Sequence, residues 1–303
     1  MSKKHSKERE VFNSFWHGKQ LTPSAIMCLN SFLYHNFDFN LWTYDQIKYV
    51  PQGVRICEAE SIYSKKALFS VEPDAVTSFS DNFRYNLLYK YGGWWVDTDV
   101  VCNTFVLPET LIAFASQSKK GTIASGQIKF PKGHRIMAAA VDQVENTDSS
   151  TWGSKGPQLL TKLISSDLDE YRWDTKHFYP IHWAESMKFI LPEYKDEIEE
   201  RTHDSMFIHL YSGMYRRVFG FDENRFLPPR GSFLEALYLR WGIGEIVSCL
   251  KPIDEALLRR KIAYCIHQNW LKKRISRKEL HFHTKTRYRI ISLLFHLKNK
   301  VLS

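Results

Sequence analysis

The stretch that decides the fold occupies residues 80–101 and reads SDNFRYNLLYKYGGWWVDTDVV. Ser80 is a suitable N-cap, and the apolar residues after it recur at helical spacing, so we expect a helix over 80–91. The glycine pair at 92–93 permits the left-handed backbone that ends such a helix. Aromatic and β-branched residues dominate 94–101, which predicts a strand.

Two acidic residues, Asp97 and Asp99, lie inside this apolar strand, where strand geometry places their side chains on one side. Burial of two carboxylates is costly unless a positive group meets them, and a hard divalent cation is the natural partner. On the preceding helix, Asp81 and Arg84 are three residues apart and therefore share a face. Each pair alone has a plain explanation: an ion pair on a helix surface, or a strand end in solvent. Together they indicate one site that receives three acids and a guanidinium.

This order of parts resembles the sugar-binding, DXD-containing region of nucleotide-sugar-dependent glycosyltransferases. The shared pattern is a Ser-Asp-x-x-Arg helix, a Gly-Gly turn, an aromatic position and Asp-x-Asp, all present within residues 80–101. The resemblance is closest to the group that includes large glucosylating toxins, yeast-type initiating mannosyltransferases and bacterial capsular or lipopolysaccharide sugar transferases. It implies a GT-A type α/β fold, a Rossmann-like open mixed sheet flanked by helices. It also implies metal-dependent, retaining transfer of a hexose or N-acetylhexosamine from a nucleoside-diphosphate sugar, with a UDP-sugar favoured.

The resemblance implies a role for each charged residue. Asp99 is expected to bind the metal, Mn²⁺ or Mg²⁺, directly, and Asp97 to bind the ribose and reach the same ion. Asp81 and Arg84 are expected to hold the donor sugar, with Arg84 near the diphosphate as a second cationic group. Asp97, Asp99 and Arg84 are therefore the predicted catalytic residues. No enzymic nucleophile is evident, so retention is expected to proceed by displacement on one face without a covalent intermediate.

Two further donor-binding elements are expected from the same resemblance. Trp16 ends a predicted strand over 11–18, where related families place an aromatic that packs on the nucleotide base; burial in the core is the other reading. Gly156 and Pro157 begin a Gly-Pro-x-Leu-x-Thr element, which the family places near the donor sugar. Gly156 lets backbone approach a ligand and Pro157 fits the first helical position, but a plain helix start explains both equally well.

A late strand predicted over 206–212 supplies the last candidates. In the resembling enzymes such a strand delivers a further metal or diphosphate contact. His209 is the candidate metal ligand, with Ser212 behind it as a donor-binding residue. The alternative is a histidine satisfied within the core. The family's usual tryptophan is replaced here by Met214 or Tyr215, a departure from its pattern.

The beginning of the chain reads as a βαβ unit, the opening of a mostly parallel sheet. A strand over 11–18 leads to a helix capped by Thr22 with Pro23 first, and a second strand covers 39–44. In such sheets ligands bind beyond the carboxyl ends of the strands. The other expected elements are helices at 61–69 and 133–145, strands or loops at 106–108, 111–115 and 122–130, and a strand at 178–180.

The net charge of +9 is concentrated at the end of the chain. Residues 251–303 hold fourteen Lys and Arg against three acids, or +11, which leaves 9 − 11 = −2 for the rest. We expect a glycosyltransferase domain over 1–250 and a basic amphipathic tail over 251–303, with helices at 252–268, 272–280 and 286–301. The tail either lies on an anionic membrane or packs on its own domain.

Partners and location follow from these patterns. The expected partners are a nucleotide-sugar donor and a glycan or lipid-linked glycan acceptor, in surface polysaccharide synthesis, with no nucleic acid. Five scattered cysteines, no Asn-x-Ser/Thr acceptor and a charged first decapeptide predict a cytoplasmic protein, peripheral on the inner face of the cytoplasmic membrane.

Two other functions stay open at this stage. Residues 96–101 also fit the Asp-x-Asp-x-Thr/Val motif of haloacid-dehalogenase-like phosphatases, which place it on the first strand and need a later lysine and acidic pair. The second alternative is a non-catalytic glycan- or membrane-binding protein on a transferase fold. The intact set of Asp81, Arg84, Asp97 and Asp99 argues against it.

Overall fold

The computed structural model describes residues 10–66, 76–107, 109–117, 121–147, 153–164 and 166–275, with side chains as far as Gln268. The chain divides into two compact units. The first comprises Met1–Arg216 with Phe221–Ile253, and the second Arg217–Gly220 with Asp254–Ser303. The division of the chain into a glycosyltransferase domain over 1–250 and a basic tail over 251–303 stays a prediction.

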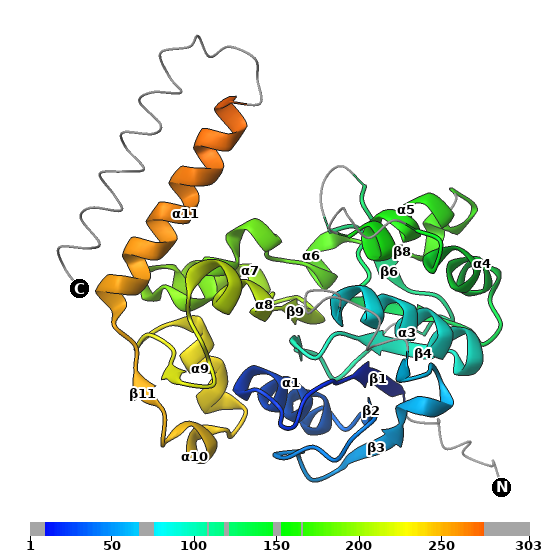
Figure 1. Ribbon diagram of the computed structural model, residues 1–303, viewed down its shortest axis with the longest axis horizontal. Coiled ribbons are helices and arrows are strands. Elements are labelled where there is room, and N and C mark those ends of the chain that lie inside the picture. The colour runs from blue at the N-terminus through cyan, green and yellow to red at the C-terminus, as the bar shows by residue number, and fades with distance from the viewer. Residues whose placement is uncertain are drawn as a thin grey trace, which may run out of the picture. The chain divides into compact units, whose positions relative to one another are not determined.

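A five-stranded sheet lies at the centre of the first unit, in the order β3-β2-β1-β4-β7 (Figure 1). Strands β1, β2, β3 and β4 run parallel to one another and β7 runs antiparallel to β4. The strands are β1 (Val11–Phe15), β2 (Asp38–Thr43), β3 (Val54–Glu58), β4 (Gly93–Val96) and β7 (Gln127–Phe130). The sheet is therefore open and mixed, with its central strands mostly buried.

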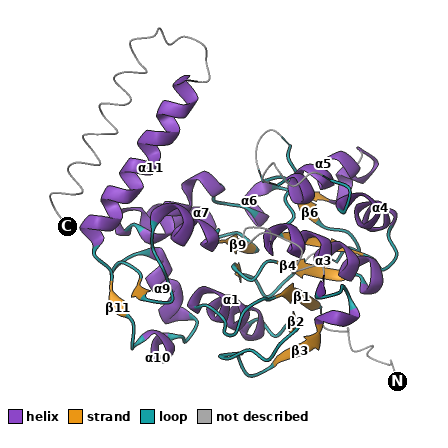
Figure 2. Cartoon of the chain, viewed as in Figure 1, coloured by secondary structure: helices purple, strands orange, loops and turns teal. Residues whose placement is uncertain are grey.

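Helices cover both faces of this sheet. Successive side chains of β1 point to opposite faces, and each face provides apolar side chains for a helix to pack on. Phe12 packs on Phe32 of helix α1 (Pro23–Tyr34), with ring centroids 4.6 Å apart. Phe15 packs on Phe83 of helix α3 (Val76–Tyr91), also at 4.6 Å, on the opposite face. Helix α4 (Arg135–Val144) lies beside α3, and α5 (Leu159–Leu163) follows next to it (Figure 2). This arrangement confirms the predicted GT-A type α/β architecture.

Shorter elements complete the first unit. Strand β5 (Val100–Cys102) pairs with β9 (Phe207–His209), β6 (Phe114–Ala115) with β8 (Arg172–Trp173), and β10 (Phe226–Leu227) with β11 (Lys251–Pro252). The other α-helices among the described residues of this unit are α6 (Thr175–Phe178), α7 (Lys195–Thr202), α8 (Ser212–Met214), α9 (Phe233–Arg240) and α10 (Gly244–Val247). Its short 3-10 or π turns in the described residues are η1 (Ala59–Ser61), η3 (Ser154–Gln158), η4 (Ser166–Tyr171), η5 (Trp183–Ile190) and η6 (Pro192–Tyr194). The turn η7 (Tyr215–Phe219) begins in the first unit and ends in residues that belong to the second.

The central stretch differs from its prediction at both ends. Helix α3 already runs from Val76, so Ser80 is inside the helix and not its cap; burial of Phe79 against Phe15 extends it upstream. The strand expected over 94–101 is interrupted after Val96, and a turn carries the two acids. Aspartate favours turns over strands, and the chain then continues as β5 in a different sheet. Asp97 and Asp99 therefore flank a turn instead of sharing one strand face.

Most other predicted elements are present, with shifted ends. Thr22 caps α1, with Pro23 at its first turn, and α4 lies within the predicted 133–145. The edge strand β3 was not predicted, and residues 61–64 are not the helix expected there; 67–75 lie outside the described residues. The strand expected at 178–180 is wrong, because Asp174 caps the short helix α6 that ends at Phe178.

The segments expected as strands or loops between 106 and 130 are mixed. Residues 106 and 107 form no strand and Pro108 is not described, whereas 111–115 contains β6 and 122–130 contains β7. The late strand expected over 206–212 is present only as β9 (Phe207–His209), whose last residue is the candidate metal ligand His209.

The second unit contains one long described helix, α11 (Glu255–Ile275). The sequence predicted a break between 268 and 272, but the helix continues, since it contains no glycine or proline. The start of the helix expected over 272–280 is thus part of α11; its remainder and the helix expected over 286–301 lie outside the described residues. Within the part of the chain that the structure describes, no helix has both the length and the apolar character needed to cross a bilayer.

Candidate active site

The guanidinium of Arg84 joins the helix to the acidic turn. One of its terminal nitrogens donates to Asp81 Oδ1, and the other donates to Asp97 Oδ1 at 2.7 Å. The guanidinium also lies over the Trp95 ring, 4.9 Å from its centroid, and Trp95 Nε1 donates to the same Asp97 oxygen at 2.9 Å. Arg84 is only 3% exposed, so this is a buried cation between two carboxylates.

Burial and pairing compete in setting the charges of this group. Burial raises the pKa of Asp81 to about 6, although the neighbouring Arg84 opposes that shift. Burial would lower the pKa of Arg84, but Asp97 and Asp81 outweigh it and raise that pKa above its ordinary value. Arg84 therefore stays cationic.

Asp99 lies on the far side of the turn and contacts a different strand. Its Oδ1 is 3.1 Å from His209 Nε2, and its Oδ2 accepts from the backbone N and the Oγ of Ser212, at 2.8 and 3.0 Å. Burial would raise the pKa of Asp99, but His209 and the two bonds from Ser212 lower it to about 2. Burial would lower the pKa of His209, but Asp99 raises it above the ordinary value. The site thus holds Asp99 as a carboxylate.

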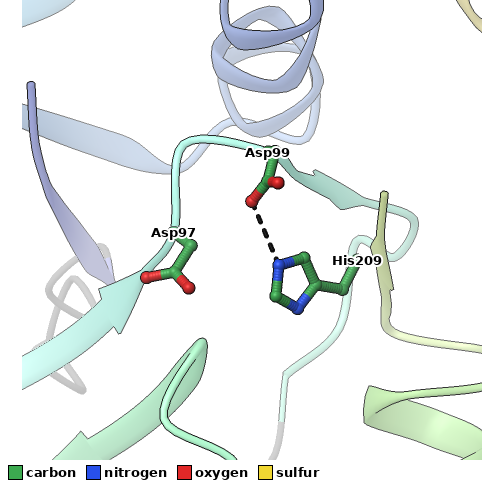
Figure 3. Close-up of side chains that lie close together, drawn as sticks. All are labelled: Asp97, Asp99 and His209. Carbon is green, nitrogen blue, oxygen red and sulfur yellow. Dashed lines mark ion pairs between the residues drawn. The ribbon is translucent and has the colours of Figure 1, made fainter. Parts of the chain in front are cut away.

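Asp97, Asp99 and His209 lie together (Figure 3), and one ligand atom from each falls within 4.8 Å of the others. In the close-up, the side chains of Asp97 and Asp99 leave opposite ends of one turn, and His209 approaches from β9. His209 Nδ1 is buried and lacks a hydrogen-bond partner. A divalent cation such as Mn²⁺ suits this set of two carboxylates and one imidazole, whose ring still has an unpartnered nitrogen. These residues fit the metal that the sequence led us to expect.

The predicted glycine-proline element also lies at this site. A Cβ built on Gly156 would lie 2.8 Å from Asp81 Oδ1, so only glycine fits against this carboxylate. The hydroxyl of Tyr85 donates to the carbonyls of Lys155 and Gly156, at 2.9 and 3.3 Å. Pro157 is inside the turn η3, not at the first position of a helix as expected, because the helical backbone already begins at Ser154.

Trp16 follows the end of β1 and is partly exposed, so the reading as a core residue is wrong. Its indole Nε1 donates to the carbonyl of Gln20 at 3.1 Å. The structure brings together Asp81, Arg84, Asp97, Asp99, Gly156, His209 and Ser212. The side-chain hydrogen bond of Trp16 goes to Gln20, outside this group. Base stacking by Trp16 stays a prediction.

Two regions of the chain match known glycosyltransferase regions. Residues 28–115 match the glycosyltransferase sugar-binding region containing the DXD motif, and residues 129–224 match the alpha 1,4-glycosyltransferase conserved region. The first span includes Asp81, Arg84, Asp97 and Asp99, and the second includes His209. Both matched regions are regions of glycosyltransferases, and the first is the one that contains the DXD motif.

Individual relatives of the chain are distant. It is 27% identical to mouse lactosylceramide 4-alpha-galactosyltransferase over 156 residues, which cover 46% of this chain and 42% of the relative. It is 29% identical to human alpha-1,4-N-acetylglucosaminyltransferase over 189 residues, covering 56% of this chain and 54% of the relative. The chain spans about half the length of the curated relatives it matches.

Solved structures give weaker likenesses. The PaToxG glycosyltransferase aligns at a TM-score of 0.40 and 12% identity, covering 64% of this chain and 78% of that one. The Streptococcus pneumoniae glycosyltransferase GlyE aligns at 0.47 and 11%, covering 85% of this chain and 64% of that one.

Three residues of the candidate site were not found from the sequence. Gly126 accepts from Asp97 N through its carbonyl at 2.8 Å, and a Cβ there would lie 3.0–3.1 Å from His209 and Asp97 atoms. The lone glycine before a strand was the available signal for such a close approach. Trp95, in the last residues of β4, donates to Asp97 through its indole nitrogen. Tyr211 contacts His209, and no local pattern distinguished it from other strand aromatics.

Proposed function

We propose that this protein is a metal-dependent, retaining glycosyltransferase that moves a hexose or N-acetylhexosamine from a nucleoside-diphosphate sugar to a glycan hydroxyl. A UDP-sugar, such as UDP-galactose, is the proposed donor. The observation that carries the proposal is the buried Arg84, paired with Asp81 and Asp97, directly beside three groups able to bind one cation. The Arg84 guanidinium and a metal ion beside it would together bind the negative charge of a diphosphate.

The proposed reaction breaks the bond between the anomeric carbon and the diphosphate oxygen and forms a bond to the acceptor oxygen. The acceptor proton passes to the departing diphosphate oxygen, so displacement on one face needs no enzymic nucleophile. A bound divalent cation supplies positive charge to the diphosphate as negative charge builds there. Asp97, Asp99 and His209 would hold it, with Ser212 fixing the Asp99 carboxylate.

The remaining residues act on the donor directly. Arg84 is oriented by two carboxylates and the Trp95 ring, so its charge is placed before the reaction begins. Asp81, with Gly156 against it, accepts hydrogen bonds from sugar hydroxyls. Trp16, at the end of β1, packs on the base.

We infer the acceptor and the linkage from the relatives. One relative is named a lactosylceramide 4-alpha-galactosyltransferase, and the names of another relative and of one matched region specify alpha-1,4 transfer. We therefore propose an α-1,4-linkage to a lipid-linked glycan in surface polysaccharide synthesis. The basic segment 251–303 supports a cytoplasmic protein that lies peripherally on an anionic membrane.

Slow hydrolysis of the donor tests this function without knowledge of the acceptor. Purified protein is incubated with a panel of nucleotide sugars and Mn²⁺, and release of the nucleoside diphosphate is measured. We expect hydrolysis of one donor, abolished by chelation and lowered at least about a hundredfold in Asp99→Asn. Asp45→Asn, at an exposed ion pair with Lys65, is the matched control. No donor hydrolysis in the presence of metal would contradict the proposal.

Phosphatase activity has little support from the geometry. The acidic turn follows β4 and not the first strand of the chain, and Asp97 is engaged by Arg84 and Trp95. Hydrolysis of simple phosphate esters in the same assay would favour that alternative.

A further inference from the structure

The imidazole of His209 is held by an aromatic ring from the residue two positions later. The ring of Tyr211 stacks on it with centroids 4.1 Å apart and planes inclined by 23°. Tyr179 lies on the ring more loosely, with centroids 6.0 Å apart. The His209 side chain is only 13% exposed, and the Tyr211 hydroxyl donates to the Ile181 carbonyl at 3.3 Å. Tyr211 is thus fixed at one end and braces His209 with its ring.

The backbone of Tyr211 has a second, separate effect. Its φ of 53° and ψ of 45° are left-handed, a conformation that residues with a side chain rarely adopt. In a continuous strand the side chains of 209 and 212 would point to opposite faces, because they are three residues apart. The left-handed residue ends β9 and begins the turn of α8, where Met214 N donates to the Tyr211 carbonyl at 2.8 Å. As a result, His209 and Ser212 reach the two oxygens of one carboxylate, Asp99.

The cost of this conformation suggests a selected feature. A strained backbone persists where the surrounding structure determines it, and it occurs often at functional sites. Among the described residues, the non-glycine residues with positive φ are Asn36, Tyr49 and Tyr211. Tyr211 is the one that lies between two residues of the candidate metal site.

We propose that Tyr211 is a positioning residue for the metal site: its ring fixes the His209 imidazole and its left-handed backbone turns Ser212 onto Asp99. The inference rests on the proposed function, because it assumes that these side chains bind a divalent cation. Without the Tyr211 ring, the His209 imidazole is free to rotate. Metal binding must then order the imidazole, and the entropy lost in doing so weakens the affinity for the metal.

Mn²⁺ binding, followed by electron paramagnetic resonance of the free ion, tests the inference without turnover. Tyr211→Asn removes the ring, and asparagine tolerates the left-handed backbone. We expect a Kd for Mn²⁺ that is raised about fivefold to tenfold, as expected for the loss of one aromatic contact. Tyr211→Phe keeps the ring and is expected to rescue affinity to within about twofold of the wild type. Tyr49→Asn is the matched control, since Tyr49 has a φ of 63° and is 55% exposed.

The outcomes separate the inference from the proposed function. Saturable Mn²⁺ binding in the wild type that Asp99→Asn abolishes, together with weaker binding in Tyr211→Asn, supports both. Wild-type affinity in Tyr211→Asn overturns the inference alone. The inference is also overturned if Tyr49→Asn loses as much Mn²⁺ affinity as Tyr211→Asn does. The same holds if Tyr211→Phe loses as much as Tyr211→Asn. No binding by the wild type overturns the metal dependence of the proposed function. If Tyr211→Asn does not fold by circular dichroism, Tyr211→Gly, which accepts left-handed backbone and also lacks the ring, measures the same loss.

Discussion

At the scale of single residues, the candidate site consists of charged side chains that are buried together with groups of opposite charge or with hydrogen-bond donors. Arg84 pairs with two carboxylates, and Asp99 is matched by His209 and by two donors from Ser212. Removal of one member leaves its partner buried without compensation, which costs more than the pair itself contributes. Substitutions at Arg84 or Asp81 would therefore confound stability with function, and small changes of shape are better probes.

Gly156→Ala is such a probe. The new Cβ would lie 2.8 Å from Asp81 Oδ1, so η3 and the carboxylate must move apart. We expect a loss of about 1–3 kcal/mol in the free energy of unfolding and a KM for the donor raised about tenfold, a change equivalent to about 1.4 kcal/mol. The measurements are urea denaturation and the donor-hydrolysis assay.

Gly244→Ala provides the control, because no atom lies within 4 Å of a Cβ built at Gly244 and its φ is not positive. It should leave both quantities near their wild-type values. An unchanged KM in Gly156→Ala would show that the glycine-proline element does not contact the donor.

At the scale of elements, an ion-pair network joins η5 to α7, the helix that precedes β9. Arg201 donates to both oxygens of Glu185, at 3.0 and 3.1 Å. Lys188 contacts Glu197 at 2.6 Å and Glu185 at 2.9 Å. Because α7 is the element before β9, the strand that carries His209, this network helps to fix the chain where it enters β9.

The network predicts a pH dependence of stability. Hydrogen bonding to Arg201 lowers the pKa of Glu185 to about 2, against the opposing effect of burial. A lowered pKa stabilises the fold above the unfolded-state pKa, and this contribution is lost as the pH falls toward about 2. Glu185→Gln should therefore reduce the free energy of unfolding by roughly 1 kcal/mol at neutral pH.

Urea denaturation at about pH 6.5 and about pH 3.5 checks the sign, since the difference between wild type and Glu185→Gln must shrink at the lower pH. Glu200→Gln, at an exposed position on the same helix, is the control. A difference that stayed constant or grew with acidity would contradict the assigned role.

At the scale of the whole molecule, charge is divided unevenly along the chain. Residues 251–303 carry +11 and the preceding residues −2. Helix α11 contributes Arg259 and Arg260, both exposed, to this basic segment. A lipid-linked acceptor would make such a segment useful, because anionic lipids attract it to the surface where the acceptor is anchored.

Vesicle sedimentation tests the attraction. We expect the full chain to bind vesicles with phosphatidylglycerol and not neutral vesicles, and binding to weaken with salt. Arg259→Gln with Arg260→Gln should lower the partition coefficient about tenfold or more, since each basic residue contributes about 1 kcal/mol. The charge-preserving pair Arg259→Lys with Arg260→Lys should bind like the wild type. Equal binding to neutral and anionic vesicles would contradict the electrostatic mechanism.

The sequence by itself determined the parts of this protein whose causes are local. The βαβ opening, the glycine-terminated helix, the pairing of Asp81 with Arg84 and the acidic Asp-x-Asp stretch all follow from spacing and propensity within a few residues. The family resemblance added His209 and Gly156 to the candidates, and the structure places both beside the acids.

Only the tertiary structure decided how these parts meet. The break after Val96 places Asp97 and Asp99 on a turn, since β5 pairs with the distant β9 and not with the central sheet. The left-handed Tyr211 follows the β9 strand of this pairing, and Gly126 closely approaches His209, which is also distant from it in the chain. Local propensity carries no information about such contacts, because their free energy comes from groups that are about a hundred residues apart in the chain.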